Sequence, residues 1–416
     1  MTRTDDGHPG LARRSLLTGG AAGLGAAFGT GALLGLGGGL AGARALQPAG
    51  GETEPSGCEA EPFGGEVLPC HGAHQAGVVT PPGANIRYLA YELRDETDAD
   101  ALGRMFRILT GDIEGLTSGV APLADPEPEL AARPARLAIT VGIGPEVLRR
   151  VAADPAPDWL GPLPVFSRDR LGTGYDGGDL LLVVQADDAT AVAHAARMLD
   201  RDLASFARPR WRQHGFRQAR GAESEGTTTR NLMGQLDGTV NPAPADEDFA
   251  SLVWLGEESG PLAGGTALVL RRIRMELDTW DQVDRPGREQ SVGRRLSDGS
   301  PLSSPPGSGE HTPADFAARD ELGLSAIPVA AHIRRAHSSN PAERIFRRSD
   351  NYDDGTEAGL LFACYQRDPL TQFVPIQRRL DEVDLLNEWV THVGSAVFAI
   401  LPGFRAGETL GGSLFA

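Results

Sequence analysis

The sequence repeats one order of apolar strands and amphipathic helices, and this repeat constrains the fold more than any other feature. In the first part, the patterns predict a strand, a helix, a second strand, and a strand that runs into a helix: residues 85–93 ("NIRYLAYEL"), 99–116, 135–144 and 179–203. After position 240 a similar order returns, with a strand, a partly helical stretch, a strand, an amphipathic helix and a closing strand: residues 266–277, 279–295, 359–368, 375–393 and 395–404.

This order favours an α+β fold with antiparallel strands in each repeat. A chain of 416 residues is long enough for two hydrophobic cores. No glycine-rich dinucleotide or phosphate loop follows a predicted strand, so a doubly wound parallel sheet is disfavoured. Two successive units, each of about 150 residues or somewhat more, therefore indicate two ferredoxin-like domains.

We place the two domains at residues 83–235 and 236–416. Residues 46–82 are rich in Gly, Pro and Glu, without a sustained apolar period, and are predicted to be a flexible arm. The Ser, Pro and Gly content of residues 285–315 indicates a long surface insertion.

Residues 1–45 resemble a twin-arginine export signal. Arg13 and Arg14 precede 28 uncharged residues from Leu16 to Ala43, and "ARA" at 43–45 offers a cleavage point. A permanent membrane anchor is the alternative, but 11 of those 28 residues are Gly, which lowers both helix propensity and hydrophobicity. We expect a periplasmic, extracellular or cell-envelope protein, in which Cys58 and Cys70 could form a disulfide.

The charge of the chain excludes some classes of partner. Lys and Arg total 39 against 56 for Asp and Glu, and the net charge of −17 repels nucleic acids and anionic membrane surfaces. Arginines nevertheless cluster in the runs 271–278 and 332–348, where they could form a positive pocket for an anionic ligand.

Asp237 lies in the run "NLMGQLDGTVNP" and has two interpretations. Asp-Gly between apolar residues is a strong signal for a tight hairpin turn. The alternative is a reactive carboxylate, and the run by itself does not decide between them.

His332 also has two interpretations. It follows the apolar residues "PVAA" and precedes two arginines on a predicted short helix or turn. An isolated histidine in such a place is most often a core residue with a hydrogen-bond partner. Here Arg347 follows 15 residues later in "RIFRRSDNYDDG", and the "GQLDG" run lies upstream, which favours an axial ligand of a metal cofactor.

These motifs together resemble the dye-decolourising peroxidases, a haem family built from two ferredoxin-like domains of the dimeric α+β barrel type. "GQLDG" is similar to the family's GxxDG motif, and "AHIRRA", "NP", "RIFRRSDNYDDG" and "GLLFACYQRD" are similar to its histidine and arginine region. The resemblance runs from "HGAHQAGVVTPP" to "VGSAVFAILPG", and it is greatest to the exported branch that includes the deferrochelatase/peroxidase of bacterial ferrous-iron uptake.

The resemblance implies non-covalent haem b in the C-terminal domain, with His332 as the axial iron ligand. It further implies Asp237 as the distal acid/base and Arg347 as the distal cation, with Arg348 as the competitor for that role. Porphyrin contacts are implied for Gly238, Thr239, Val240, His337 and Arg347.

The residue types suit this chemistry. A carboxylate can accept a proton from hydrogen peroxide and return it to the departing oxygen. The reference pKa of an Asp is about 3.9, which predicts activity at acidic pH unless burial raises that pKa. Arginine stays cationic and stabilises negative charge as the O–O bond breaks.

We therefore expect a peroxidase that reduces hydrogen peroxide and oxidises one-electron donors such as dyes or phenols. A haem-binding or iron-delivery protein of an iron-uptake system, with incidental peroxidase activity, is the alternative. Hydrogen peroxide and a reducing substrate are the expected partners, and iron-uptake components are candidates. The sequence is compatible with a homodimer.

Overall fold

The computed structural model describes residues 63–151, 156–224 and 226–415, in which the two predicted repeats form matching halves of one sheet. The predicted signal peptide and Cys58 lie outside the described residues. Cys70 and residues 75–78 belong to the predicted flexible arm, but they are buried in the structure. Within the described residues, no helix is both long and apolar enough to cross a bilayer.

The N-terminal half has the order strand, helix, strand, strand, helix, strand. Its main elements are β1 (Asn85–Leu93), α1 (Ala99–Thr117), β2 (Ala138–Ile143), β3 (Leu180–Ala186), α3 (Ala189–Leu203) and β4 (Ala207–Phe216), with the short α2 (Pro145–Arg150) after β2. The strands pair in the order β2-β3-β1-β4, all antiparallel, which is the ferredoxin-like arrangement.

The C-terminal half repeats this topology. Its strands are β5 (Thr266–Met275), the short β6 (Phe346–Arg347) and β7 (Asp350–Asp353), β8 (Ala358–Gln366) and β9 (Val390–Ile400). β5 lies between β8 and β9, while β6 and β7 pair with β8. The predicted α+β class with two ferredoxin-like units is therefore confirmed.

The two halves close into a barrel. β2 pairs with β9 through Gly142 and Ile143, and β4 pairs with β7 at Phe216 and Asn351. A side chain at Gly142 would lie 2.9 Å from the Cδ1 atom of Ile400, so glycine permits the close approach at the first of these seams.

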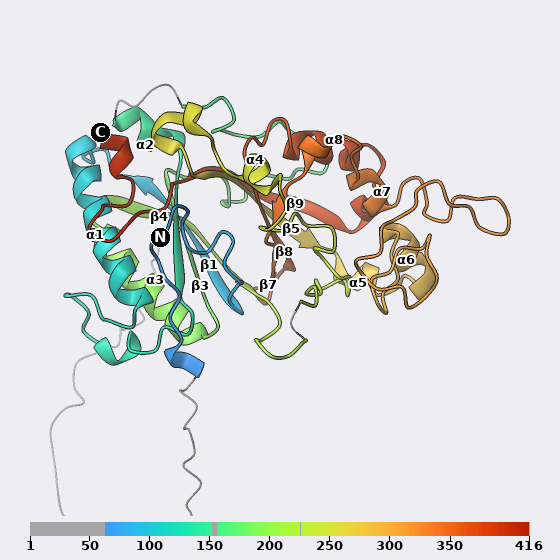
Figure 1. The fold of residues 1–416 in the computed structure, drawn as a ribbon, viewed down its shortest axis with the longest axis horizontal. Coiled ribbons are helices and arrows are strands. Elements are labelled where there is room, and N and C mark those ends of the chain that lie inside the picture. The colour runs from blue at the N-terminus through green and yellow to red at the C-terminus, as the bar shows by residue number, and fades with distance from the viewer. Residues whose placement is uncertain (1–62, 152–155, 225, 416) are drawn as a thin grey trace, which may run out of the picture. The chain divides into compact units, whose positions relative to one another are not determined.

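Long helices cover the sheet of the N-terminal half. Asp98 begins α1 by accepting a hydrogen bond of 2.8 Å from the amide of Ala101. Apolar residues then recur at helical spacing and pack with α3 over the strands; they include Leu102, Phe106, Leu109 and Ile113. Figure 1 shows α1 and α3 side by side on the flank of the strands.

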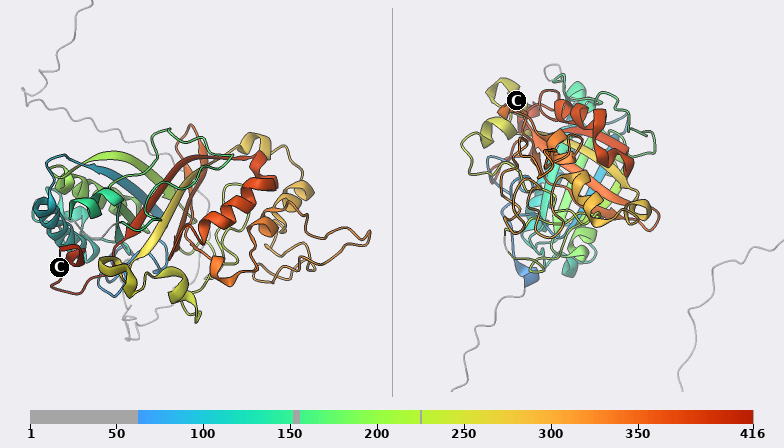
Figure 2. Two further views of the ribbon diagram at one scale, coloured as in Figure 1. Left: turned by 90° about the horizontal axis from the view of Figure 1, so that it is seen from above. Right: turned by 90° about the vertical axis from the view of Figure 1, so that its right-hand side faces the viewer.

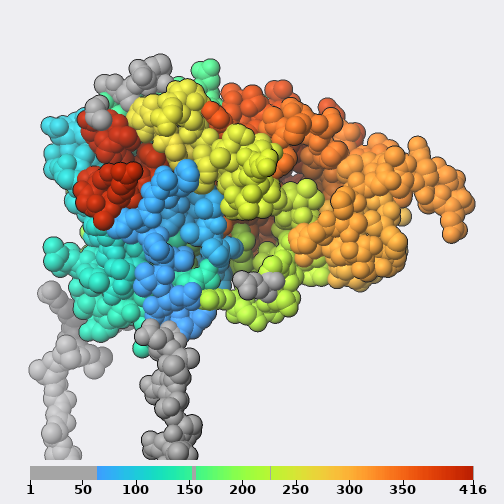
Figure 3. Space-filling model, viewed as in Figure 1, coloured from blue at the N-terminus to red at the C-terminus, as the bar shows by residue number. Residues whose placement is uncertain are grey.

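The helical layer of the C-terminal half is different. α8 (Phe373–Val383) occupies the position that α3 has in the first half. The long first helix is replaced by three short helices, α5 (Leu277–Trp280), α6 (Arg285–Val292) and α7 (His332–Ala336), and by a loop that projects after α6. Figures 1 and 2 show these elements at the end of the barrel opposite α1, and Figure 3 shows the same loop in orange.

Two sequence predictions differ from the structure. The helix predicted over 375–393 ends at Val383, and a 3-10 turn (Leu385–Glu388) separates it from β9. β4 was not predicted, because its inward positions carry Trp211, Gln213 and Gly215 rather than aliphatic residues.

Candidate active site

A cavity of about 470 Å3 lies on the outer face of the C-terminal half, where the first long helix is missing. Its floor is the outer face of β5, β8 and β9, and segments of α7 and α8 form its sides. All the residues predicted for the site line this one cavity: Asp237, Gly238, Thr239, Val240, His332, His337 and Arg347.

The strand register explains the cavity floor. Side chains of a strand alternate between the two faces of a sheet, so Arg271, Ile273 and Met275 of β5 face the cavity. Arg272, between them, faces the barrel interior and pairs with Asp354. The floor is therefore mainly apolar, with a buried arginine at one end.

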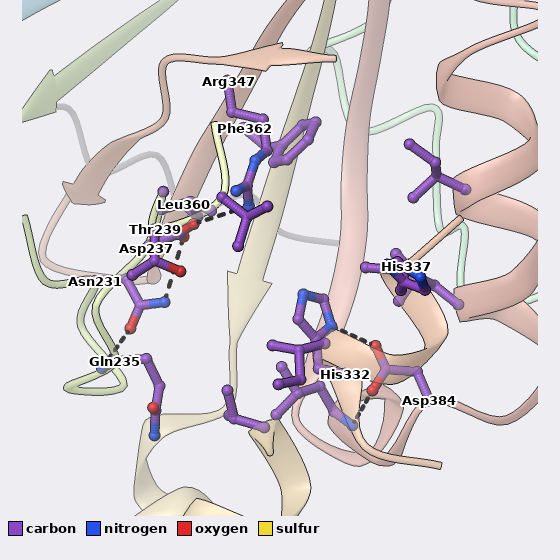
Figure 4. A pocket seen from close by; sticks show the side chains of 18 of the residues that line it. Asn231, Gln235, Asp237, Thr239, His332, His337, Arg347, Leu360, Phe362 and Asp384 are labelled. Carbon is purple, nitrogen blue, oxygen red and sulfur yellow. Dashed lines mark hydrogen bonds and ion pairs between the residues drawn. The ribbon is translucent and has the colours of Figure 1, made fainter. Parts of the chain in front are cut away.

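His332 is the first residue of α7. Its Nδ1 atom lies 2.6 Å from Oδ2 of Asp384, which accepts the hydrogen bond, so the other ring nitrogen, Nε2, is available to the cavity (Figure 4). Burial lowers the pKa of His332, but the charge and hydrogen bond of Asp384 outweigh it and raise the pKa above the usual value.

Asp384 was not identified from the sequence. Its side chain is only 4% exposed, and its Oδ1 atom also accepts a hydrogen bond of 3.0 Å from the amide of Leu386. The carboxylate is thus fixed from two directions and orients the imidazole of His332. The only signal in the sequence is an Asp at the start of the short turn "LLNE", which by itself indicates a helix cap.

Asp237 directly follows the turn of its segment. The tight turn lies at 231–235, where Asn231 and Gln235 bond through their backbones, and Arg230 pairs with Leu236. Of the two interpretations of Asp237, the tight turn is therefore found a few residues before Asp-Gly. Asp237 is held by a hydrogen bond of 3.0 Å from its amide to the carbonyl of Thr229.

Asn231 and Arg347 face the carboxylate of Asp237. The Oδ1 atom of Asn231 accepts from the amides of Met233 and Gln235, so its Nδ2 points to Asp237 Oδ2 at 3.5 Å. Arg347 Nη1 lies 3.5 Å from Asp237 Oδ1. Both contacts are long for hydrogen bonds, so the polar atoms keep the capacity to bind a small molecule.

Asn241 holds the backbone of Arg347. Its Nδ2 donates to the carbonyl of Arg347 at 2.9 Å, and its Oδ1 accepts from the amide of Arg347 at 2.8 Å. Arg348, the competitor in the sequence, does not line the cavity, and its Nη1 donates to the carbonyl of Thr80 at 2.6 Å. The geometry favours Arg347.

Figure 4 shows Asp237 and Arg347 on one side of the cavity and His332 with Asp384 on another. Gly238 has a φ of 129°, a conformation that favours glycine, and Val240 is 73% exposed. His337 directly follows α7 and packs on Phe316, with ring centroids 4.8 Å apart.

No group of three or more His, Cys, Asp or Glu in the described part of the chain could hold a metal ion. The Nε2 atom of His332 faces the cavity and would suit a metal whose other ligands come from a cofactor. On the other side, a carboxylate and a guanidinium can move a proton and stabilise negative charge.

Comparisons with known proteins agree over most of the chain. The family models described as "Dyp-type peroxidase, N-terminal" and "Dyp-type peroxidase, C-terminal" match residues 75–217 and 228–405. The chain is 37% identical over 440 residues to the dye-decolorizing peroxidase of Thermobifida fusca, with 100% of this chain and 99% of that protein covered. It is 31% identical to the deferrochelatase of Escherichia coli O157:H7, with 83% and 86% covered.

Solved structures are similar as well. A DyP-type peroxidase from Cellulomonas bogoriensis is 47% identical, with a TM-score of 0.80, covering 85% of this chain and 99% of that chain. DtpA from Streptomyces lividans, solved as an oxyferrous/water mixed complex, is 37% identical with a TM-score of 0.82 and the same coverage.

Proposed function

Because this chain belongs to the Dyp-type peroxidase family, we propose that it reduces hydrogen peroxide at a haem bound through His332 and oxidises one-electron donors. The chain is a haem peroxidase by its family, and the roles of its residues and the class of donor are the proposal. The observation that carries it is the arrangement around one cavity, with an imidazole paired to Asp384 on one side and Asp237 beside Arg347 on another.

The residues of the cavity fit a haem. Aliphatic and aromatic side chains such as Ile273, Leu360 and Phe362 would contact the apolar porphyrin. The Nε2 atom of His332 has no hydrogen-bond partner among the described residues and would bind the iron. Asp384 would make this imidazole a stronger electron donor by accepting a hydrogen bond from its Nδ1–H.

When bound, the haem supplies an iron that takes oxidising equivalents from peroxide and passes them to donors one electron at a time. Asp237 accepts a proton from one oxygen of hydrogen peroxide and returns it to the other oxygen, which leaves as water. Asn231 keeps the carboxylate turned toward the cavity through its Nδ2 contact.

Arg347 stabilises the negative charge that develops on the departing oxygen. An arginine guanidinium carries a positive charge, and Asn241 fixes the backbone of Arg347. The pair of Asp237 and Arg347 is loose at 3.5 Å, so both side chains can bind peroxide without first breaking a short ion pair.

The test follows peroxide reactivity in the haem-loaded protein. Asp237→Ala and Arg347→Leu should each bind haem as the wild type does and should slow the peroxide-dependent change in the Soret band by about 10²-fold or more. Asp246→Asn, which removes an acid of the same segment that does not line the cavity, is the matched control and should react normally. Unchanged rates in both site variants would contradict the proposal.

Release of iron from haem is a second candidate, favoured by the relatives named deferrochelatase at 31–32% identity. Incubation of the haem-loaded protein under reducing conditions should then yield metal-free protoporphyrin, detected by its fluorescence. A protein that acts only as a peroxidase leaves the porphyrin metallated.

We also propose export by the twin-arginine route, on the support of Arg13, Arg14 and the uncharged segment that follows them. Replacing both arginines by lysine should retain the folded, haem-loaded protein in the cytoplasm, as fractionation would measure. Normal export of that variant would contradict this proposal.

A further inference from the structure

A segment of the N-terminal half crosses to the C-terminal half and runs beside β9. It comprises residues 166–177, between α2 and β3 in the chain, and we call it the crossing segment. The amide of Arg170 donates to the carbonyl of His392 on β9 at 2.8 Å. The amide and the hydroxyl of Ser167 both donate to the carboxylate of Asp381 on α8, at 2.9 and 2.7 Å. The crossing segment is therefore fixed to the elements that form the floor and one side of the cavity.

Asp169 of the crossing segment forms a buried ion pair with Arg271 of β5. Its Oδ1 atom accepts a hydrogen bond from Nη2 of Arg271, and the two side chains are only 3% and 1% exposed. The other oxygen, Oδ2, accepts from the amide of Phe166 at 3.2 Å, and the ring of Phe166 lies 5.6 Å from Cζ of Arg271. The carboxylate is thus held by its own segment and presented to the guanidinium.

This pair determines the charge at one end of the cavity floor. Arg271 lines the cavity beside His392 of β9, whereas Asp169 lies behind it and does not line the cavity. Burial lowers the pKa of Arg271, while the charge and the hydrogen bond of Asp169 oppose that effect, so the guanidinium stays cationic. Burial and the charge of Arg271 lower the pKa of His392 to about 3, so this imidazole is neutral at working pH. The local charge is therefore the balance between Arg271 and Asp169.

A charge at this place acts on the iron through space. The nitrogen atoms of Arg271 are buried and engaged by the protein, so no contact with a ligand is required. Charges shielded from water interact over longer distances than exposed ones. An unbalanced positive charge stabilises the ferrous state of a haem relative to the ferric state, which carries one more positive charge. Asp169 cancels such a charge within hydrogen-bond distance.

We propose that Asp169 is a positioning residue that keeps the reduction potential of the haem low by neutralising Arg271. The inference rests on haem bound in this cavity through His332. It gives the N-terminal half an influence on the iron, although the axial ligand and the distal pair both belong to the C-terminal half.

The test is a spectroscopic redox titration of the haem-loaded full chain. Asp169→Asn leaves the charge of Arg271 unbalanced, so the ratio of ferrous to ferric haem at a fixed applied potential should rise about 10-fold, which is about 59 mV for one electron. The double variant Asp169→Asn/Arg271→Gln removes both charges and should return the ratio to within about 3-fold of the wild type. Both variants lose the ion pair, so only the balance of charge separates them.

Two further variants complete the test. Arg271→Gln leaves the negative charge of Asp169 and should shift the ratio in the opposite direction at pH 8, which keeps the proposal testable if Asp169→Asn does not fold. Asp381→Asn is the matched control, because Asp381 also holds the crossing segment, through Ser167, and does not line the cavity. It should titrate as the wild type does.

A wild-type ratio in Asp169→Asn would overturn the proposal. Equal shifts in the single and the double variant would overturn it as well and assign the pair a structural role. Neither outcome touches the haem peroxidase assignment, which fails only if the wild type binds no haem.

Discussion

The hydrogen bond between His332 and Asp384 allows a sharp prediction about how the protein controls its haem. Asp384→Asn keeps the size of the side chain and an oxygen that can cap the amide of Leu386, and removes only the negative charge. The contact of 2.6 Å is short and nearly shielded from solvent, since the Asp384 side chain is 4% exposed. The substitution thus isolates the charge that faces the imidazole.

The magnitude follows from the type of bond. A hydrogen bond to a charged group contributes about 1.5–3 kcal/mol, and a neutral one roughly half of that. The loss of about 1–1.5 kcal/mol corresponds to a haem affinity about 5- to 10-fold lower. The reduction potential of the iron should also rise, because a less electron-donating imidazole stabilises the ferric state less.

The assay is a haem titration together with a spectroscopic redox titration. Glu382→Gln is the control for overall charge, because Glu382 is exposed, lies close in sequence and pairs with Arg335 rather than His332. We expect this control to leave both values unchanged. An Asp384→Asn protein with wild-type affinity and potential, or a control with the same shift, would refute the reasoning.

Three further predictions concern stability. Burial, together with the hydrogen bond and charge of Asp202, raises the pKa of Asp112 from 3.8 to about 8, so the protonated carboxyl stabilises the fold fully below pH 3.8 and this stabilisation is lost as pH rises toward 8. The melting temperature of Asp112→Asn should therefore rise progressively above that of the wild type from pH 5 to pH 8. A difference in melting temperature that stays constant over this range would contradict the prediction. Asp350→Ala leaves Arg217, paired to it at 2.6 Å, without a buried partner, and should lower the free energy of unfolding by about 3–5 kcal/mol in denaturant titrations. Burial lowers the pKa of His392 to about 3, so the neutral imidazole contributes its full stability above pH 6.5 and this contribution falls as pH drops toward 3. The stability of His392→Gln should therefore fall less steeply than that of the wild type between pH 6.5 and 3. An acid-unfolding profile identical to that of the wild type would count against this prediction.

The sequence predicted the fold class because strand and helix periodicities recur in both halves. The prediction was weakest where inward and outward residues of a strand differ little in hydrophobicity. In β4 the inward residues include Gln213 and Gly215. The prediction also extended a helix through Val390 and Val393, since that spacing fits a helix as well as the start of β9. Burial on the sheet decides those cases, and it depends on partners distant in sequence.

The site was predictable where residues lie in local motifs and not where they meet only in space. Asp237, His332 and Arg347 stand in recognisable runs, and the structure brings them to one cavity. Asp384 lies 52 residues from the histidine it contacts, in a segment with several acids.

The central claim is that haem is bound through His332 in the cavity shared by Asp237 and Arg347. The most direct measurement is haem binding to His332→Ala, followed by the Soret band and electron paramagnetic resonance, with and without added imidazole. We predict that the variant loses the histidine-ligated spectrum and that imidazole restores it by entering the space left by the side chain. Wild-type spectra and affinity in His332→Ala without imidazole would contradict the account.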